Sequence, residues 1–131
     1  MDGLTELTAL RAYAKMMNTL EAECFAPILS PDLRYNSQWV FSEMKGKQEY
    51  LDYIRGKLKT IANSGRGPYA EIGELDEYPF GHCVILAQDN VDNLIATLLV
   101  GIEDGLVSKI DMCAVPDPYA VKRTGEYPGR E

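Results

Sequence analysis

Apolar side chains recur along residues 4–17 at steps of three and four positions, which is the spacing of one face of an α-helix. A second helical pattern of the same kind covers roughly residues 47–63. The run Asn-Ser-Gly at residues 63–65 supplies a C-terminal stop, because Gly readily adopts the left-handed conformation that ends a helix. The pattern therefore predicts two amphipathic helices in the first half of the chain.

The stretch between these two helices is predicted to be short and broken. Asn18 and Glu21 are spaced like a helix-starting capping box, with Asn in place of Ser or Thr. The helix that they start must be short, because Pro27 and Pro31 interrupt it. Residues 33–37 then alternate between apolar and polar side chains, which predicts a brief strand before a break and the next helix.

The periodicity changes in the second half of the chain, where strands are predicted. Residues 69–76 can form a strand, and its acidic side chains suggest an exposed edge. The strongly apolar runs 82–88 and 93–102 follow, joined by a polar turn. Residues 103–105 form a tight turn into a last strand over 106–115. Helices followed by four strands joined as hairpins predict an α+β fold, with a conical space for a small-molecule pocket between helix and sheet.

Length and composition favour a single cytoplasmic domain. The chain has 131 residues, which is the usual size of one domain, and no stretch has the length of a membrane-spanning helix. No signal-peptide pattern opens the chain, and three widely spaced cysteines lie within apolar stretches, which favours reduced thiols. We expect residues 1–115 to form the domain and residues 116–131, rich in Pro, Gly, Tyr and charge, to form an irregular tail.

Charge argues against nucleic acid as a partner. The net charge is −7, from 20 acidic and 13 basic residues, and no basic stripe with interleaved aromatic residues is present. The weak basic cluster is assigned to a solvated helix face: Lys45, Lys47, Arg55, Lys57 and Lys59. The acidic group at residues 71–77 lacks the spacing of a calcium loop and fits a solvated strand edge better. We expect no metal, no cofactor and no membrane partner.

The element order resembles that of the nuclear transport factor 2-like (NTF2-like) superfamily, in its branch of SnoaL-like polyketide cyclases and ketosteroid isomerases. The resemblance covers roughly residues 4–115. It rests further on "PDLRY" at residues 31–35 before the first strand, on "KGK" at residues 45–47, and on the final hairpin at residues 98–112. It implies a cone-shaped, cystatin-like fold, with a curved, mostly antiparallel sheet wrapped around a long N-terminal helix and two further helices. It also implies a homodimer through the outer sheet face, but no single activity.

The catalytic residues of ketosteroid isomerases transfer poorly to this chain. Those enzymes need a carboxylate base, and a Tyr with a protonated Asp as an oxyanion hole. When the sequences are aligned on Gly46, the base falls on Ser37 and the oxyanion Asp falls near Leu98. The oxyanion Tyr falls on Tyr13, but a second supporting Tyr falls on Ile54. The carboxylates are lost, so the resemblance does not imply ketosteroid isomerase activity.

A second enzymatic hypothesis uses a His–Asp pair, as in dehydratase-like relatives. His82 is the only histidine and the side chain best suited to acid–base work at neutral pH. By the same alignment Ile110, Met112 and Ala114 line the pocket, so Asp111 points to the opposite face of its strand. His82 also begins a strand, where exposure is common. A purely structural role is therefore favoured for both residues of the pair.

The remaining candidates point to ligand binding rather than reaction. Tyr35 shares strand parity with Ser37, and Trp39 beside the break can close a pocket mouth. Tyr53 lies off the apolar stripe of its helix and is assigned to the surface or to a dimer contact. The predicted ligand-binding residues are Tyr13, Tyr35, Ser37, Trp39, Ile54, Leu98, Ile110 and Met112.

Three functions remain open from the sequence. The favoured one is binding of a small apolar or aromatic organic molecule in the conical pocket of a homodimer. The second is an isomerase, cyclase or dehydratase in which Tyr13 or His82 acts as acid or base. The third is an interaction module, in which the outer sheet face binds a partner chain and the cone is only core.

Overall fold

The computed structural model describes residues 4–38, 40–75 and 81–130. Its elements, in chain order, are α1 (Glu6–Thr19), the 3-10 turns η1 (Ala22–Cys24) and η2 (Ala26–Ile28), β1 (Leu29–Ser37), β2 (Val40–Lys45), α2 (Lys47–Ser64), β3 (Pro68–Glu74), β4 (His82–Gln88), β5 (Leu94–Glu103), β6 (Leu106–Cys113), the 3-10 turn η3 (Pro118–Ala120) and β7 (Lys122–Arg123). No helix in these three ranges is both long and apolar enough to cross a membrane.

Both predicted amphipathic helices are confirmed, and their ends follow from local chemistry. The Thr5 side chain caps α1 by accepting a hydrogen bond from the Thr8 backbone N–H at 3.1 Å. The helix α2 starts after Gly46 and stops at Gly65, and both glycines have positive φ angles, of 101° and 72°. The apolar stripes of the helices are buried, with Tyr13 in α1 and Ile54 in α2 at their centres.

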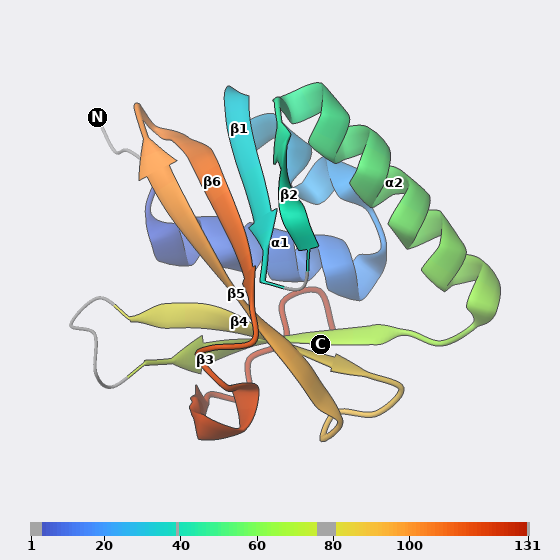
Figure 1. The fold of residues 1–131 in the computed structure, drawn as a ribbon. Coiled ribbons are helices and arrows are strands. Elements are labelled where there is room, and N and C mark those ends of the chain that lie inside the picture. The colour runs from blue at the N-terminus through green and yellow to red at the C-terminus, as the bar shows by residue number, and fades with distance from the viewer. Residues whose placement is uncertain (1–3, 39, 76–80, 131) are drawn as a thin grey trace.

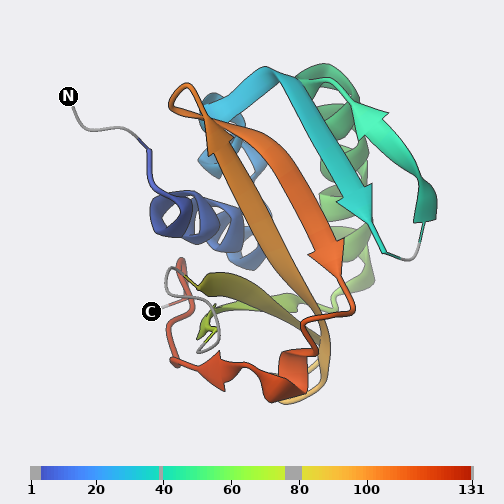
Figure 2. The same cartoon turned by 60° about the vertical axis from the view of Figure 1, so that its left-hand side comes forward.

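Within the described residues, seven strands form one sheet in the order β2-β1-β6-β5-β4-β3-β7, and only the β1–β6 pair of that sheet is parallel. The sheet is strongly curved: β1, β2 and β6 run across the direction of β3 and β4, and the long β5 bridges the two halves (Figures 1 and 2). α1 packs on β3, β4 and β5, and α2 packs on β1 and β2. The predicted α+β fold with a curved, mostly antiparallel sheet around α1 is confirmed.

Two predictions between the helices are wrong in detail. The short second helix is replaced by the two 3-10 turns, because Pro27 removes a backbone donor there. The first strand begins at Leu29, earlier than predicted, and Pro31 lies within it. The strand β2 was not predicted, because the turn between Ser37 and Val40 carries no Asn-Gly or Asp-Gly signal.

The C-terminal segment, residues 116–130, is more ordered than the predicted irregular tail. The strand β7 pairs with the edge of β3, and Val121 is buried against Ile85 on the outer face of the sheet. This pairing also corrects the prediction of an exposed acidic edge, because Glu71 on β3 is only 3% exposed. Asp76 and Glu77 of the same acidic group lie outside the described residues.

Candidate functional site

A cavity of about 490 Å³ opens at the end of the cone where α1 finishes and β3 begins. Seven elements and the loop before β3 contribute to it, so it is a product of the whole fold. It is lined by Met17, Tyr35, Ser37, Tyr53, Lys57, Ile61, Arg66, Pro68, Leu86, Ala87, Gln88, Ile95, Ala96 and Met112. Its volume lies within the range of pockets that hold small organic molecules, roughly 300–1,000 Å³.

The cavity has an apolar wall and a hydroxyl-bearing wall. The inner face of the sheet contributes Leu86, Ala96 and Met112, all of them buried. Tyr35 and Ser37 from β1 stand on the other side, and α2 adds Tyr53 beside them. Such a combination buries apolar surface and offers a few oriented hydrogen bonds, which is the usual composition of a small-molecule site.

An aromatic cluster continues from the hydroxyl-bearing wall into the core. The ring of Tyr35 lies 5.3 Å from that of Tyr50 and 5.7 Å from that of Tyr53, measured between centroids. Deeper in the cone, Tyr13 packs edge-on against Phe25 at 5.5 Å and 81°. Contacts of this kind add to the stability gained from burial and hold the rings in fixed positions.

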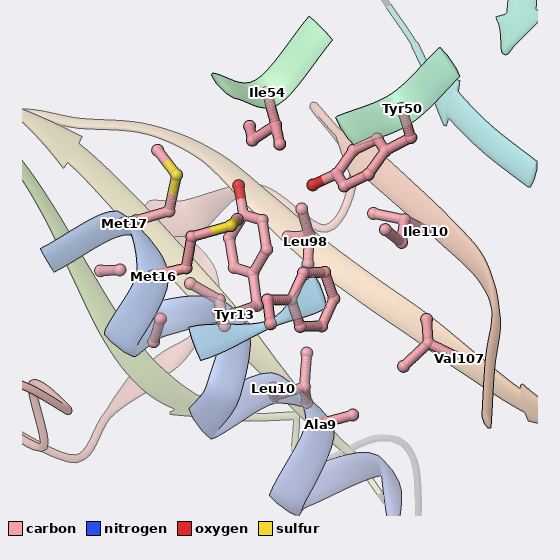
Figure 3. Close-up of a cluster of buried hydrophobic side chains, with 14 of the residues drawn as sticks. Ala9, Leu10, Tyr13, Met16, Met17, Tyr50, Ile54, Leu98, Val107 and Ile110 are labelled. Atoms are coloured by element: carbon pink, nitrogen blue, oxygen red, sulfur yellow. The ribbon is translucent and has the colours of Figure 1, made fainter. Parts of the chain in front are cut away.

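The buried tyrosines of this cluster are held in their neutral form. Burial is the main cause that raises the pKa of Tyr13 and of Tyr50 well above the ordinary value. Burial also raises the pKa of Tyr35, helped by the charge of Tyr53 and by a hydrogen bond with it. Figure 3 shows the hydroxyls of Tyr13 and Tyr50 directed into the same space beneath Ile54. At neutral pH these groups can donate hydrogen bonds, but they are not bases.

The predicted ligand-binding residues separate into three groups. Those that line the cavity are Tyr35, Ser37 and Met112. Those that are almost fully buried in the core and do not line the cavity are Tyr13, Ile54, Leu98 and Ile110. Trp39 lies outside the described residues. A binding role for any of these residues stays a prediction.

The residues of the His–Asp hypothesis do not contribute to the cavity. His82 is the first residue of β4 and pairs in register with Glu74 on β3. The Asp111 carboxylate lies 3.5 Å from the ammonium of Lys109, and neither side chain lines the cavity. Ala114, expected in the pocket from the same alignment, is exposed. Among the described residues that line the cavity there is no carboxylate and no imidazole.

Sequence reasoning misplaced two residues of α2. Tyr53, predicted at the surface or in a dimer contact, is half-buried beside Tyr35 and lines the cavity. Lys57, assigned to the solvated face, also lines it. Together with Ile61 they form a row at steps of four residues beside the buried stripe. The four-residue spacing of this row is the feature of the sequence that indicates a cavity wall on α2. The buried Tyr50 lies one helical turn before the row.

A second hollow of about 550 Å³ separates α1 from the C-terminal segment. It is more polar, and its charged groups are largely engaged. The Arg11 guanidinium pairs with Glu126 at 2.8 Å, and the Arg130 guanidinium lies over the Tyr69 ring, 4.2 Å from its centroid. Because these contacts fasten the C-terminal segment to the rest of the domain, we interpret this hollow as structural.

Metal chemistry finds no support in the part of the chain that the structure describes. No group of three or more His, Cys, Asp or Glu side chains there is arranged to hold a metal ion. The three cysteines are free thiols: Cys24 is half-buried, and Cys83 and Cys113 are buried.

Comparison with known proteins identifies the fold. No protein-family model matches the chain, and no curated protein matches it significantly in sequence. An NTF2-like protein of unknown function from Cytophaga hutchinsonii superposes with a TM-score of 0.59 over 88% of this chain and 96% of its own, at 13% identity. A proposed polyketide cyclase from Sinorhizobium meliloti superposes with a TM-score of 0.56 over 84% of this chain and 100% of its own, at 12% identity. A proposed ketosteroid isomerase from Kribbella flavida superposes with a TM-score of 0.56 over 94% of this chain and 82% of its own, at 20% identity. The chain therefore has the NTF2-like, or cystatin-like, fold.

Proposed function

We propose that this protein binds a small apolar or aromatic organic molecule in the cavity at the open end of the cone. The observation that carries the proposal is the cavity itself, about 490 Å³ with a largely apolar lining. Buried apolar area supplies most of the affinity in such a site. In this proposal the hydroxyls of Tyr35, Ser37 and Tyr53, which line the cavity, orient the molecule.

Turnover is the second candidate, because two of the similar structures are a proposed polyketide cyclase and a proposed ketosteroid isomerase. An isomerase, cyclase or dehydratase would use Tyr13 or His82 as acid or base. Tyr13 is kept neutral by burial, and His82 stands outside the cavity lining, so recognition is the better supported function. Assays on polyketide-like and steroid-like substrates distinguish the two, because an enzyme should lose turnover in Tyr13→Phe or in His82→Ala. A wild type indistinguishable from both variants would remove the enzymatic candidate.

The third candidate is an interaction module, in which the outer face of the sheet binds a partner chain. We also propose a homodimer through the outer face of the sheet. The C-terminal segment covers this face over β3 and β4 (Figure 2), so the contact would involve β5 and β6, where Leu99 is half-buried and Asp111 pairs with Lys109. Sedimentation should show a dimer that Leu99→Lys converts to a monomer. A wild-type monomer would contradict this part of the proposal.

A reducing compartment is proposed as the place of action, in keeping with the cytoplasmic expectation. Its support is that Cys83 and Cys113, buried on the outer sheet face, are free thiols. Mass spectrometry of the protein isolated under thiol-blocking conditions should find both alkylated only after unfolding, with no disulfide.

Thermal unfolding with a panel of apolar and aromatic compounds tests the binding proposal. A ligand at about 100 times its Kd should stabilise the fold by about 2.7 kcal/mol. Ala96→Phe places a ring in the cavity from its sheet wall and should abolish the stabilisation, because Ala96 lines the cavity. Ala62→Phe on the exposed face of α2 is the matched control and should retain it. Stabilisation by no compound, or equal stabilisation of both variants, would contradict binding in this cavity.

A further inference from the structure

The cavity differs in charge from the rest of the molecule. The chain has 20 acidic and 13 basic residues and a net charge of −7. Among the described residues, the cavity lining nevertheless includes two cations, Lys57 and Arg66, and no Asp or Glu. In a strongly acidic protein, this local reversal makes the cavity mouth the place where an anionic ligand meets attraction instead of repulsion.

Only one of these two cations is available to a ligand. The Arg66 guanidinium faces Asp89, with its Nε 2.9 Å from Oδ1 and a terminal nitrogen on Oδ2, so its charge is already balanced. In the ranges that the structure describes, no carboxylate lies within 4.0 Å of the Lys57 ammonium. The ammonium also donates no hydrogen bond to a protein group in these ranges. Lys57 is therefore the unpaired charge of the cavity.

The surroundings of Lys57 direct that charge toward the cavity. Its side chain is half-buried, and its Nζ lies over the Tyr53 ring at 5.8 Å from the centroid. Tyr53 precedes it by one helical turn and lines the same cavity, so the two side chains belong to one wall of it. The Tyr53 ring carries no opposite charge, so this contact leaves the charge of the ammonium unpaired.

We propose, on the basis of the proposed function, that the ligand is an organic monocarboxylate. Its ring or alkyl part enters the cavity against Leu86, Ala96 and Met112, and its carboxylate stays at the mouth and pairs with Lys57. One unpaired ammonium matches a single negative charge, whereas a phosphate dianion would need a second free cation, which the pairing of Arg66 with Asp89 denies. A carboxylic acid is ionised at neutral pH, so the pairing requires no proton transfer.

A matched pair of probes tests this inference. 2-Naphthoate and 2-naphthamide have nearly the same shape and differ in charge. Isothermal titration at low salt should show the wild type binding the acid about 2- to 5-fold more tightly than the amide, the range expected for one partly exposed ion pair. Added salt should reduce the difference.

Variants of two neighbouring lysines test whether Lys57 causes the preference for the acid. Lys57→Met should remove the preference, so that the ratio of acid to amide affinity falls to about one, and Lys57→Arg should keep the preference. Lys59→Met is the control, because it makes the same change of net charge on the exposed face of α2 and should bind like the wild type. If the methionine variant does not fold, Lys57→Gln gives the same test.

The outcomes separate this inference from the proposed function. Equal binding of acid and amide by the wild type would overturn the inference and leave the cavity as a binding site for neutral molecules. An acid preference that survives in Lys57→Met would also overturn it. Binding of neither probe would contradict both proposals.

Discussion

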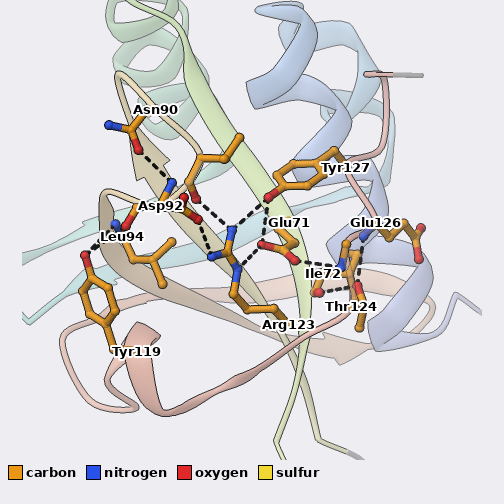
Figure 4. Close-up of polar contacts among 12 residues, drawn as sticks. Glu71, Ile72, Asn90, Asp92, Leu94, Tyr119, Arg123, Thr124, Glu126 and Tyr127 are labelled. Carbon is orange, nitrogen blue, oxygen red and sulfur yellow. Dashed lines mark hydrogen bonds and ion pairs between the residues drawn. The ribbon is translucent and has the colours of Figure 1, made fainter.

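Arg123 in β7 donates a hydrogen bond from Nε to Oε1 of Glu71 in β3, over 2.8 Å. Glu71 is almost fully buried, and it also accepts from the Gly125 backbone N–H at 2.7 Å and from the Tyr127 hydroxyl at 3.0 Å (Figure 4). The C-terminal segment supplies every one of these donors. The carboxylate can be buried only because that segment folds over it.

Arg123→Met should destabilise the protein strongly, because it leaves the Glu71 charge buried without its cation. We expect a loss of about 3 kcal/mol in the free energy of unfolding, measured by urea titration. Arg11→Met is the matched control, since it breaks the Arg11–Glu126 pair, whose two side chains are 48% and 40% exposed, and should cost less than about 1 kcal/mol.

A double mutant separates the charge from the packing. In the Glu71→Gln background, Arg123→Met should cost clearly less than in the wild type, because no buried charge remains to be compensated. An equal cost in both backgrounds would show that Arg123 stabilises β7 through its other contacts, with Asp92 and the Val91 carbonyl.

The helices and central hairpins were predictable because their signals are local. The stripe in α1 and the stop at Gly65 depend only on residues a few positions apart. The burial of Glu71 was not predictable in this way, because it depends on Arg123, 52 positions later in the chain. Read locally, an acidic strand looks like an exposed edge.

The candidate site shows the same limit. Tyr35, Ser37 and Met112 were placed near a pocket through a family resemblance, and they do line the cavity. Tyr53 and Lys57 were missed because periodicity alone assigns each helical residue either to the core or to solvent. A residue that lines a cavity belongs to neither class, and Tyr53 and Lys57 are both half-buried there.

Gly73 on β3 is a position where the C-terminal segment leaves no room for a side chain. A Cβ there would lie 2.7 Å from Cγ1 of Val121 and 2.8 Å from Cδ1 of Ile85. Val121 is β-branched and cannot turn away easily. Gly73→Ala should therefore lower the free energy of unfolding by about 1–3 kcal/mol, although Ala normally favours a strand over Gly.

Chemical denaturation of two further variants checks this explanation. Gly101→Ala is the control, because its nearest contact would be the Cβ of Lys109 at 3.5 Å, an ordinary van der Waals distance. Combining Gly73→Ala with Val121→Ala should recover part of the loss. If the two losses simply add, the clash with Val121 is not the cause.

The buried thiols should be nearly unreactive in the folded protein. Burial, and then the charge of Cys113, raises the pKa of Cys83 to about 12, and burial followed by the charge of Asp111 raises that of Cys113 to about 11. At pH 8 the thiolate fractions fall by about 1000-fold and 100-fold against an ordinary thiol. Alkylation with iodoacetamide, followed by peptide mass spectrometry, should label the half-buried Cys24 first. Equal rates for Cys83 in buffer and in urea would contradict its burial.

The buried tyrosines predict a loss of stability at high pH. Burial raises the pKa of Tyr13 and Tyr50 in the folded protein, whereas both titrate near 10 when the chain is unfolded. Above pH 10 the unfolded chain loses these protons first, so its free energy falls relative to that of the folded state. Each tyrosine should then reduce the free energy of unfolding by about 1.4 kcal/mol per pH unit, with its full contribution retained below pH 10.

Tyr50→Phe isolates one of these contributions. Urea titrations at pH 9 and at pH 11 should show a loss of stability over this interval that is smaller than that of the wild type by about 1.4 kcal/mol, because one group that titrates only in the unfolded chain has been removed. Phe25→Leu disturbs the same core without removing an ionisable group, so it should lower stability equally at every pH. An unchanged slope in Tyr50→Phe would mean that the Tyr50 hydroxyl ionises in the folded protein as readily as in the unfolded chain. Solvent would then reach the Tyr50 ring through the cavity. The core behind the hydroxyl-bearing wall would in that case be part of the binding site.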